Sequence, residues 1–331
     1  MPQEMLLNKN DTLMLKGGGI LLMLFHHLFY SEWSQQYYDD ITFQGIGVIN
    51  KIGIFSKLCV AVFVFVSGYG LAASTPKDFL LKDFYRRRFK KLYLNYWYIW
   101  LLFVPIAYFV YDRTFTEAYG EHTLIKSILD IFGLLAMFGC DSYNPTWWFY
   151  NCIIILYLLF PLFNKCLLTN TYLLVSVSIT CGLLSIIIPG VVVVSGYLFT
   201  FLIGMLMAKM PIKWVIDTGW WQVLIALMAL SLWRMTKNCP TQIADGLLCM
   251  GMALLIYKIN WSNRLRKVLE TLGKHSMNMF LIHTFIFYYW FTDIIYVTRN
   301  PLLIFLSLLA ISLLISIIIE KSKQLVRFYQ I

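Results

Sequence analysis

The chain has 331 residues, of which 60% are hydrophobic, 17% are aromatic and only 13% are charged. Soluble domains of this length do not have such a composition, so the sequence indicates a membrane protein with several spans. The formal net charge of +10 does not indicate nucleic-acid binding, because Lys and Arg lie in short segments between hydrophobic runs, where they report membrane orientation.

Ten hydrophobic runs approach the roughly 20 residues that a helix needs to cross a bilayer. They lie at residues 13–30, 52–74, 92–111, 147–164, 172–189, 194–210, 219–235, 242–258, 275–297 and 302–320. An eleventh run, 124–139, is shorter and ambiguous. No cleavable signal is expected before the first run, because residues 1–15 are polar and of mixed charge.

Basic segments set the orientation of these runs. The segment 77–91, KDFLLKDFYRRRFKK, carries seven Lys and Arg residues and two Asp, whereas 31–45 carries three acidic residues and no Lys or Arg. The positive-inside rule therefore places 77–91 in the cytoplasm and 31–45 outside, with both termini inside. When the predicted spans are counted on from the cytoplasmic segment 77–91, both ends of the run 124–139 lie on the outer side of the membrane. The sequence predicts an all-α bundle of about ten transmembrane helices plus one re-entrant or interfacial helix, forming a single domain over 1–331.

Two basic segments carry further expectations. Aromatic residues interleave with the bases of 77–91, as in a helix lying along the inner leaflet, and the seven bases are equally suited to binding an anionic cofactor. Lys321, Lys323 and Arg327 are also expected in the cytoplasm.

The stretch 16–30, KGGGILLMLFHHLFY, contains the deepest ionisable side chain of the chain, that of His27. A charge at the centre of a membrane helix costs about 2.5–3.5 kcal/mol, which makes such a residue a functional candidate. Lys16 lies eleven positions earlier, so on a helix the two share nearly one face, with Lys16 roughly 16 Å closer to the cytoplasm. The glycines 17–19 would allow another backbone or a bound cofactor to approach that face.

A packing role is the alternative for these residues. His27 would then donate to a neighbouring helix, and Lys16 would reach the headgroups. For His26, which is turned about 100° away on the helix, packing is the favoured interpretation.

Other polar residues lie near the ends of predicted spans. Ser67 belongs to FVFVSGYG (63–70), and LGKHSMNMFLIHTF (272–285) contains Ser276, Asn278 and His283. The stretch WWFYN (147–151) contains Trp148, Tyr150 and Asn151. Tryptophan and tyrosine alone are ordinary at a membrane interface, and Ser276 with Asn278 is compatible with a helix-start cap.

The seven cysteines are not spaced as metal ligands, and no metal is expected. Cys140 and Cys239 both lie in predicted outer loops, where a disulfide between them is compatible with the topology.

Several of these motifs, taken in order, resemble one family. Lys16 and His27 resemble the basic-X10-His signature of the type-3 integral-membrane acyltransferases, bacterial O-acyltransferases that modify surface polysaccharides. The further motifs that carry the resemblance are FVFVSGYG, RRRFKKLYLNYW (86–97), WWFYNCIIILYLLFPLF (147–163), FLIGM (201–205) and LGKHSMNMFLIH (272–283). The resemblance extends over nearly the whole chain.

The resemblance implies transfer of an acyl group, most simply acetyl, from cytoplasmic acyl-CoA to a hydroxyl of an extracytoplasmic polysaccharide or lipid-linked sugar. It implies a bacterial inner-membrane location, with His27 as the essential histidine. Lys16 matches a basic partner that is more often arginine, and lysine lacks the bidentate fork of arginine. Arg88 and Lys91 match the paired basic residues of the family, again with lysine in the second place.

The residues fit this chemistry independently of the resemblance. An imidazole near neutral pKa can take the proton of the acceptor hydroxyl. Cations for the CoA phosphates are offered by Lys16, Arg86, Arg87, Arg88 and Lys91, with Ser67 nearby. Donors for the developing oxyanion include Ser67, Tyr150 and Asn151, and further substrate-facing candidates are Trp148 and His283.

Several alternatives stay open at the level of sequence. His27 can act as a base or become acylated itself, and the oxyanion candidates are not ranked. A transporter or flippase of a lipid-linked sugar is the alternative function, although no repeated halves support it. The acceptor is expected to enter through a mouth formed by 31–45, 112–146 and the outer helix ends, and an oligomer is compatible with the sequence.

Overall fold

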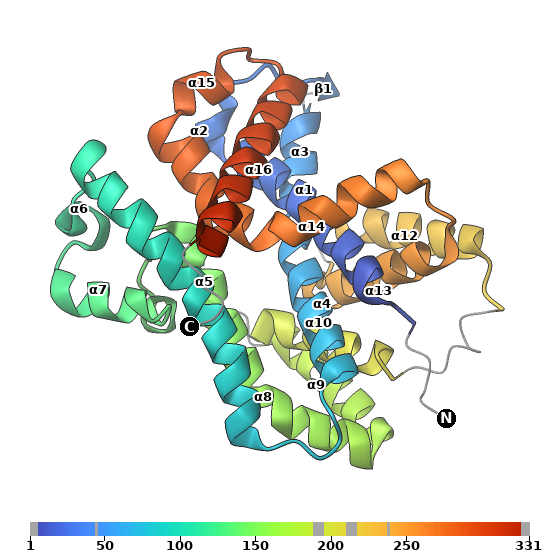
Figure 1. Cartoon of the computed structure of the whole chain (residues 1–331). Helices are drawn as coiled ribbons and strands as arrows, with labels where there is room; N and C mark the ends of the chain where they lie inside the picture. Colours follow the sequence, from blue (N-terminus) through green and yellow to red (C-terminus); the bar gives the residue numbers. More distant parts are fainter. Residues whose placement is uncertain (1–5, 44–45, 188–194, 210–216, 237–238, 326–331) are drawn as a thin grey trace. The chain divides into compact units, whose positions relative to one another are not determined.

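The computed structural model describes residues 6–43, 46–187, 195–209, 217–236 and 239–325, which are mostly helical (Figure 1). The α-helices are α1 (Lys9–Phe29), α2 (Glu32–Gln35), α3 (Val48–Phe55), α4 (Leu58–Ser74), α5 (Leu81–Val110), α6 (Phe115–Tyr119), α7 (Thr123–Ile131), α8 (Trp148–Thr169), α9 (Thr171–Ile187), α10 (Ser195–Met207), α12 (Trp220–Arg234), α13 (Thr241–Lys258), α14 (Asn263–Thr284), α15 (Thr292–Tyr296) and α16 (Pro301–Leu325). Two 3-10 helices, η1 (Leu135–Phe138) and η2 (Pro145–Trp147), and a π-helix, η3 (Phe285–Trp290), complete the helical elements. Strands β1 (Thr42–Phe43) and β2 (Ile46–Gly47) pair antiparallel. The predicted all-α class is confirmed.

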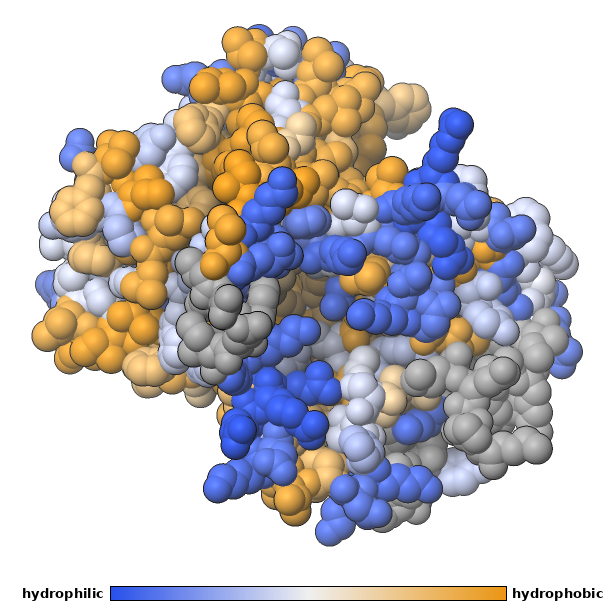
Figure 2. All heavy atoms as spheres, viewed as in Figure 1, coloured by the Kyte–Doolittle hydropathy of each residue, from blue (hydrophilic) through white to orange (hydrophobic). Residues whose placement is uncertain are grey.

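Helices of membrane-spanning length confirm that the protein crosses a membrane several times. In the described part of the chain, five helical stretches are long and apolar enough to span: α1, α3 with α4, α5, η2 with α8, and α16. Helices α9 and α10 contain shorter apolar stretches, and α12, α13 and α14 overlap three further predicted runs. Figure 2 shows broad hydrophobic surfaces, as lipid-facing helices require, with hydrophilic residues gathered in patches.

The helices differ in their bounds from the predicted runs at three places. The basic segment 77–91 is helical from Leu81, as predicted, and it is continuous with the predicted run 92–111, because α5 extends from Leu81 to Val110. The predicted run 275–297 is three pieces: α14 begins earlier, at Asn263, and gives way to η3 and then α15. The run 52–74 lies within the candidate span Val48–Ser74, which begins four residues earlier and consists of α3 and α4.

The ambiguous run 124–139 forms α7 and η1, which have nine and four residues. At about 1.5 Å per residue, nine residues extend only about 14 Å, too short to cross a bilayer. Its apolar side chains Leu124, Ile125 and Phe138 are exposed, as an interfacial or re-entrant element requires.

The chain forms two compact units. The first unit comprises Met1–Gly19, Leu58–Lys90 and Cys152–Gly273, and the second comprises Ile20–Lys57, Lys91–Asn151 and Lys274–Ile331. The first unit therefore contains α4, α9, α10, α12 and α13, and the second contains α2, α3, α6, α7, α15 and α16. Helices α1, α5, α8 and α14 contribute residues to both.

Glycines allow close helix crossings in the first unit. A Cβ added at Gly68 of α4 would lie 2.2 Å from the Phe201 carbonyl oxygen of α10, and one at Gly204 would lie 2.3 Å from the Phe65 oxygen. Helices α1 and α14 cross in the same way, because a Cβ at Gly273 would lie 2.0 Å from the Leu13 oxygen. Only glycine permits backbones to approach this closely.

Candidate active site

Helix α1 carries both Lys16 and His27, and it is continuous from Lys9 to Phe29. Both side chains are partly exposed. The predicted close approach at the intervening glycines is found at Gly17, where an added Cβ would lie 2.2 Å from the Leu269 oxygen of α14. No atom lies within 4 Å of a Cβ added at Gly18. The eleven-residue spacing is therefore a spacing along one helix, with glycines between the two side chains.

Aromatic rings surround the His27 imidazole in the second unit. Its centroid lies 4.8 Å from that of His283, 4.9 Å from His26 and 6.5 Å from Phe287. Within the described residues no hydrogen bond reaches the His27 ring. A partly exposed imidazole with uncommitted nitrogens is available to a substrate hydroxyl.

His26 is held differently from its neighbour. Its side chain is buried, its Nδ1–H donates to the Gly53 carbonyl oxygen at 2.8 Å, and its ring stacks on Tyr30 at 4.3 Å. These contacts suit the packing role that the sequence favours for His26.

His283 is fully buried on α14, with contacts at both ring nitrogens. Its Nδ1–H donates to the Phe280 carbonyl oxygen at 2.7 Å, and its Nε2 lies 3.3 Å from the Thr284 hydroxyl. Because a carbonyl only accepts, Nδ1 carries the proton, and in the neutral ring Thr284 donates to Nε2. The two neighbouring imidazoles therefore differ in their hydrogen bonds: both nitrogens of His283 have a partner, whereas those of His27 have none among the described residues.

Three residues behind His283 were not predicted from the sequence. The Thr146 hydroxyl lies 3.4 Å from that of Thr284 and donates to the Asn144 side-chain oxygen at 2.8 Å. Asn144 also caps η2 by accepting from the Thr146 backbone N–H. The stretch NPT (144–146) is a capping residue followed by proline, a pattern that starts helices, so the sequence indicates the start of η2. The sequence does not indicate that this segment contacts α14.

The short helix η2, which precedes α8, packs on α14 at Leu281. The Trp147 indole N–H donates to the Leu281 carbonyl oxygen at 3.1 Å, and the Asn144 amide donates to the same oxygen at 3.4 Å. These two bonds anchor the segment of α14 that carries His283, two residues further on.

The three candidates at the start of α8 have different surroundings. Trp148 is partly exposed, with its ring centroid 6.1 Å from that of Phe149. The buried Tyr150 hydroxyl donates to the Leu92 carbonyl oxygen at 3.3 Å. Asn151 is only 1% exposed, and within the described residues its Nδ2 has no hydrogen-bond acceptor.

The candidate donor-binding residues lie mainly in the first unit. The Ser67 hydroxyl on α4 donates to the Phe63 carbonyl oxygen at 2.8 Å. Two turns further along α4, Ser74 accepts from the Arg88 guanidinium at 2.9 Å. Arg88 also lies 5.8 Å from the centroid of the Phe84 ring. The structure thus brings Arg88 to the helix that carries Ser67.

The remaining cations are arranged more loosely. Arg86, Arg87 and Lys91 are exposed, and Lys91 falls in the second unit. Lys16 lies one turn before Gly19, where an added Cβ would lie 3.1 Å from the Val62 side chain. Side chains one turn apart share a face, so Lys16 is on the side of α1 that packs on α4.

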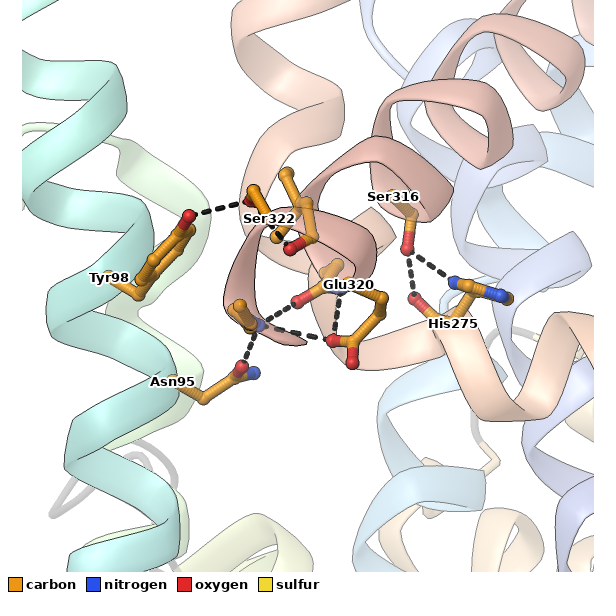
Figure 3. A network of polar contacts seen from close by, with 9 residues as sticks. Asn95, Tyr98, His275, Ser316, Glu320 and Ser322 are labelled. Carbon is orange, nitrogen blue, oxygen red and sulfur yellow. Dashed lines mark hydrogen bonds and ion pairs between the residues drawn. The ribbon is translucent and has the colours of Figure 1, made fainter. Parts of the chain in front are cut away.

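Lys323, which is predicted on the cytoplasmic side, is buried inside the second unit. Its side chain is fully buried, and its ammonium donates to the side-chain oxygens of Asn95, Asn278 and Glu320. Figure 3 shows this network, which joins α5, α14 and α16, together with the Tyr98–Ser322 contact of 2.6 Å. All three protons of the ammonium have an acceptor, so Lys323 is a clamp between helices. Arg327 lies outside the described residues.

The segment 112–146, expected to border the acceptor mouth, is organised around a buried carboxyl. Asp130 accepts from the Tyr119 hydroxyl at 2.7 Å and from the Tyr143 backbone N–H at 3.0 Å. Burial raises the pKa of the Asp130 carboxyl, although these hydrogen bonds oppose the rise. Nearby, the Arg113 guanidinium lies 3.6 Å from the centroid of the Tyr289 ring.

Cys140 and Cys239 are both free cysteines.

Comparison with known families supports the resemblance seen in the sequence. Residues 14–321 match the family model described as an acyltransferase domain. This range contains every candidate residue from Lys16 to His283. No curated protein and no solved structure matches the chain. The family implies transfer of an acyl group from a donor to an acceptor. The chain is a multi-pass membrane protein and belongs to the type-3 acyltransferase family.

Proposed function

We propose that the protein is an O-acyltransferase that moves an acyl group, most simply acetyl, from cytoplasmic acyl-CoA to a hydroxyl of an extracytoplasmic polysaccharide or lipid-linked sugar. Residues 1–331 act as one catalytic domain in the inner membrane of a bacterium, with both termini in the cytoplasm. The observation that carries the proposal is the partly exposed His27 imidazole, which has no hydrogen bond among the described residues, in a chain of this family.

His27 is the general base in this proposal. The acceptor hydroxyl gives its proton to a free nitrogen of His27 as its oxygen attacks the thioester carbonyl carbon. The proton then leaves with the CoA thiolate, so the base is regenerated in each turnover. The donor cation set is Lys16, Arg86, Arg87, Arg88 and Lys91, which neutralises the CoA phosphates.

The test is acyl transfer in membrane vesicles supplied with radiolabelled acetyl-CoA and total lipid-linked glycan. We expect His27→Asn to abolish transfer while the protein remains in the membrane at the wild-type level. His122, an exposed histidine before α7, supplies the matched control, because His122→Asn should leave transfer unchanged. Full transfer by His27→Asn would remove the assigned base. A labelled protein adduct on His27 would replace the base mechanism by an acyl-enzyme mechanism.

Acyl-CoA binding separates this proposal from a flippase. Detergent-solubilised protein should bind acetyl-CoA, and the double variant Arg88→Gln, Lys91→Gln should bind it at least tenfold more weakly, because charge-assisted hydrogen bonds are worth about 1.5–3 kcal/mol. Lys77→Gln, an exposed base outside the candidate set, is the control. A flippase has no use for acyl-CoA, so absence of binding would favour that alternative.

A further inference from the structure

Three side chains are candidates for stabilising the oxyanion of the acyl-transfer step, and the structure separates them. The hydroxyl protons of Ser67 and Tyr150 are already donated to the Phe63 and Leu92 carbonyl oxygens. The Asn151 amide is different, because its Nδ2 has no acceptor among the described residues. An oxyanion donor must be available when negative charge develops, and only Asn151 meets that condition.

An unsatisfied buried amide is itself unusual. Asn151 is 1% exposed, and buried polar groups in folded proteins nearly always have a hydrogen-bond partner. Leaving an amide unpaired destabilises the folded state, so its retention calls for a functional reason. Among the described residues, the other buried polar side-chain atoms without a partner belong to Thr75, Trp100, Arg113, Asp130, Thr200, Glu270 and Trp290. None of these residues lies on η2 or α8.

The position of Asn151 on α8 relates it to the histidine pair. Asn151 is the fourth residue of α8, and Trp147 is the last residue of η2, directly before that helix. Trp147 donates to the Leu281 oxygen of α14, and His283, two residues after Leu281, lies 4.8 Å from His27 between ring centroids. Asn151 is therefore in the first turn of α8, directly after the segment that bonds the helix carrying His283.

We propose that the Nδ2–H of Asn151 donates to the oxyanion that forms when the acceptor hydroxyl attacks the acyl thioester; this rests on the proposed acyltransferase function. The acceptor oxygen bonds to the carbonyl carbon, its proton passes to His27, and the carbonyl π electrons move to the oxygen that Asn151 binds. When the C–S bond breaks, these electrons return, and the CoA thiolate takes the proton from His27. Asn151 is thus a catalytic residue that is left unpaired in the free enzyme.

The experiment compares Asn151→Leu with Asn278→Leu in the full-length protein, measuring kcat, KM for acetyl-CoA and Tm. Asn278 is a matched control, since it is 2% exposed and both ends of its amide are paired, with Lys323 at 2.9 Å and Glu320 at 2.8 Å. We expect Asn151→Leu to lower kcat about 10²- to 10³-fold, with an unchanged KM and a Tm at or above that of the wild type. Asn278→Leu should lower Tm and leave the kcat of the folded fraction nearly unchanged.

A second variant tests the inference if Asn151→Leu does not fold. Asn151→Asp keeps the size of the side chain, and its ionised carboxylate has no donor, so kcat should fall by a similar factor at a pH where this carboxyl is ionised. A kcat within threefold of wild type in both Asn151 variants would overturn the inference while leaving the acyltransferase function intact. Parallel losses of kcat and Tm in both Asn151 variants would also overturn it, because they indicate a structural role. Absence of transfer by the wild-type protein would instead contradict the proposed function itself.

Discussion

The imidazole rings of His27 and His283 lie 4.8 Å apart between centroids, at an interplanar angle of 47°. His283 has a contact at each nitrogen, whereas no described residue hydrogen-bonds His27. Two protonated imidazoles at this separation would repel by on the order of 3 kcal/mol at an effective dielectric constant of about 20. One proton at a time is therefore favoured, and in the proposed reaction the uncommitted His27 is the ring that receives it.

The Thr284 hydroxyl should matter for activity because it holds the Nε2 of His283. Thr284→Val removes that hydroxyl while keeping its shape, and loss of one hydrogen bond is worth about 0.5–1.5 kcal/mol. We expect kcat for acyl transfer to fall roughly three- to tenfold. Thr292→Val is the control, because the Thr292 hydroxyl bonds the Tyr288 carbonyl oxygen outside this chain of contacts. An unchanged kcat in Thr284→Val would show that the hydroxyl does not set the state of His283.

Two glycines of α4, only two residues apart, should respond oppositely to alanine. Gly68→Ala places a Cβ 2.2 Å from the Phe201 oxygen, so we expect overpacking to lower the free energy of unfolding by about 1–3 kcal/mol. A Cβ added at Gly70 meets no atom within 4 Å, so Gly70→Ala should stabilise the helix by about 0.5–1 kcal/mol. Thermal unfolding in detergent measures both. Equal shifts in Tm would contradict the close crossing of α4 and α10.

The Lys323 clamp should be a determinant of stability. Lys323→Met leaves the side-chain oxygens of Asn95 and Asn278 without their donor, at about 1–3 kcal/mol for each buried acceptor. Lys321→Met, two residues earlier and exposed, is the matched control and should leave Tm unchanged. If the two variants have the same Tm, the buried network does not hold α5, α14 and α16 together.

Asp130 should make stability depend on pH. Burial raises the pKa of its carboxyl in the folded protein above the ordinary value of about 3.9, so the folded state binds more protons than the unfolded state. Stability is then greatest below about pH 4 and is lost as pH rises toward the folded pKa. Asp130→Asn removes this titration, so the Tm of the variant relative to wild type should increase between pH 4.5 and 7.5. A constant difference across this range would contradict the raised pKa.

Sequence reasoning found the elements whose signals are local. The Lys16–His27 spacing lies on one helix, as its periodicity predicted, and the glycine at position 17 does meet another backbone. The motif glycines Gly68 and Gly204 turned out to be contact points between two helices. Their partners could not be read from the sequence, because pairing of distant helices is set by packing and not by any local pattern.

Most contacts that the sequence does not predict share one physical cause: polar groups are buried by segments that lie far away in the chain. Lys323 lies among basic residues at the end of a predicted span, and the sequence does not show that contacts with α5 and α14 bury its side chain. The Thr146–Thr284 contact joins residues 138 positions apart. At Thr284, α14 becomes a π-helix, and no proline or glycine in the sequence there predicts the change.

In the proposed function, His27 catalyses acylation of a cell-surface glycan. The most direct measurement is mass analysis of that glycan from cells that carry the wild-type protein or His27→Asn at equal membrane levels. We predict ester-linked acyl groups, lost on mild alkaline treatment, only in cells with the wild-type protein. The same ester-linked groups in cells carrying His27→Asn would contradict a catalytic role of His27.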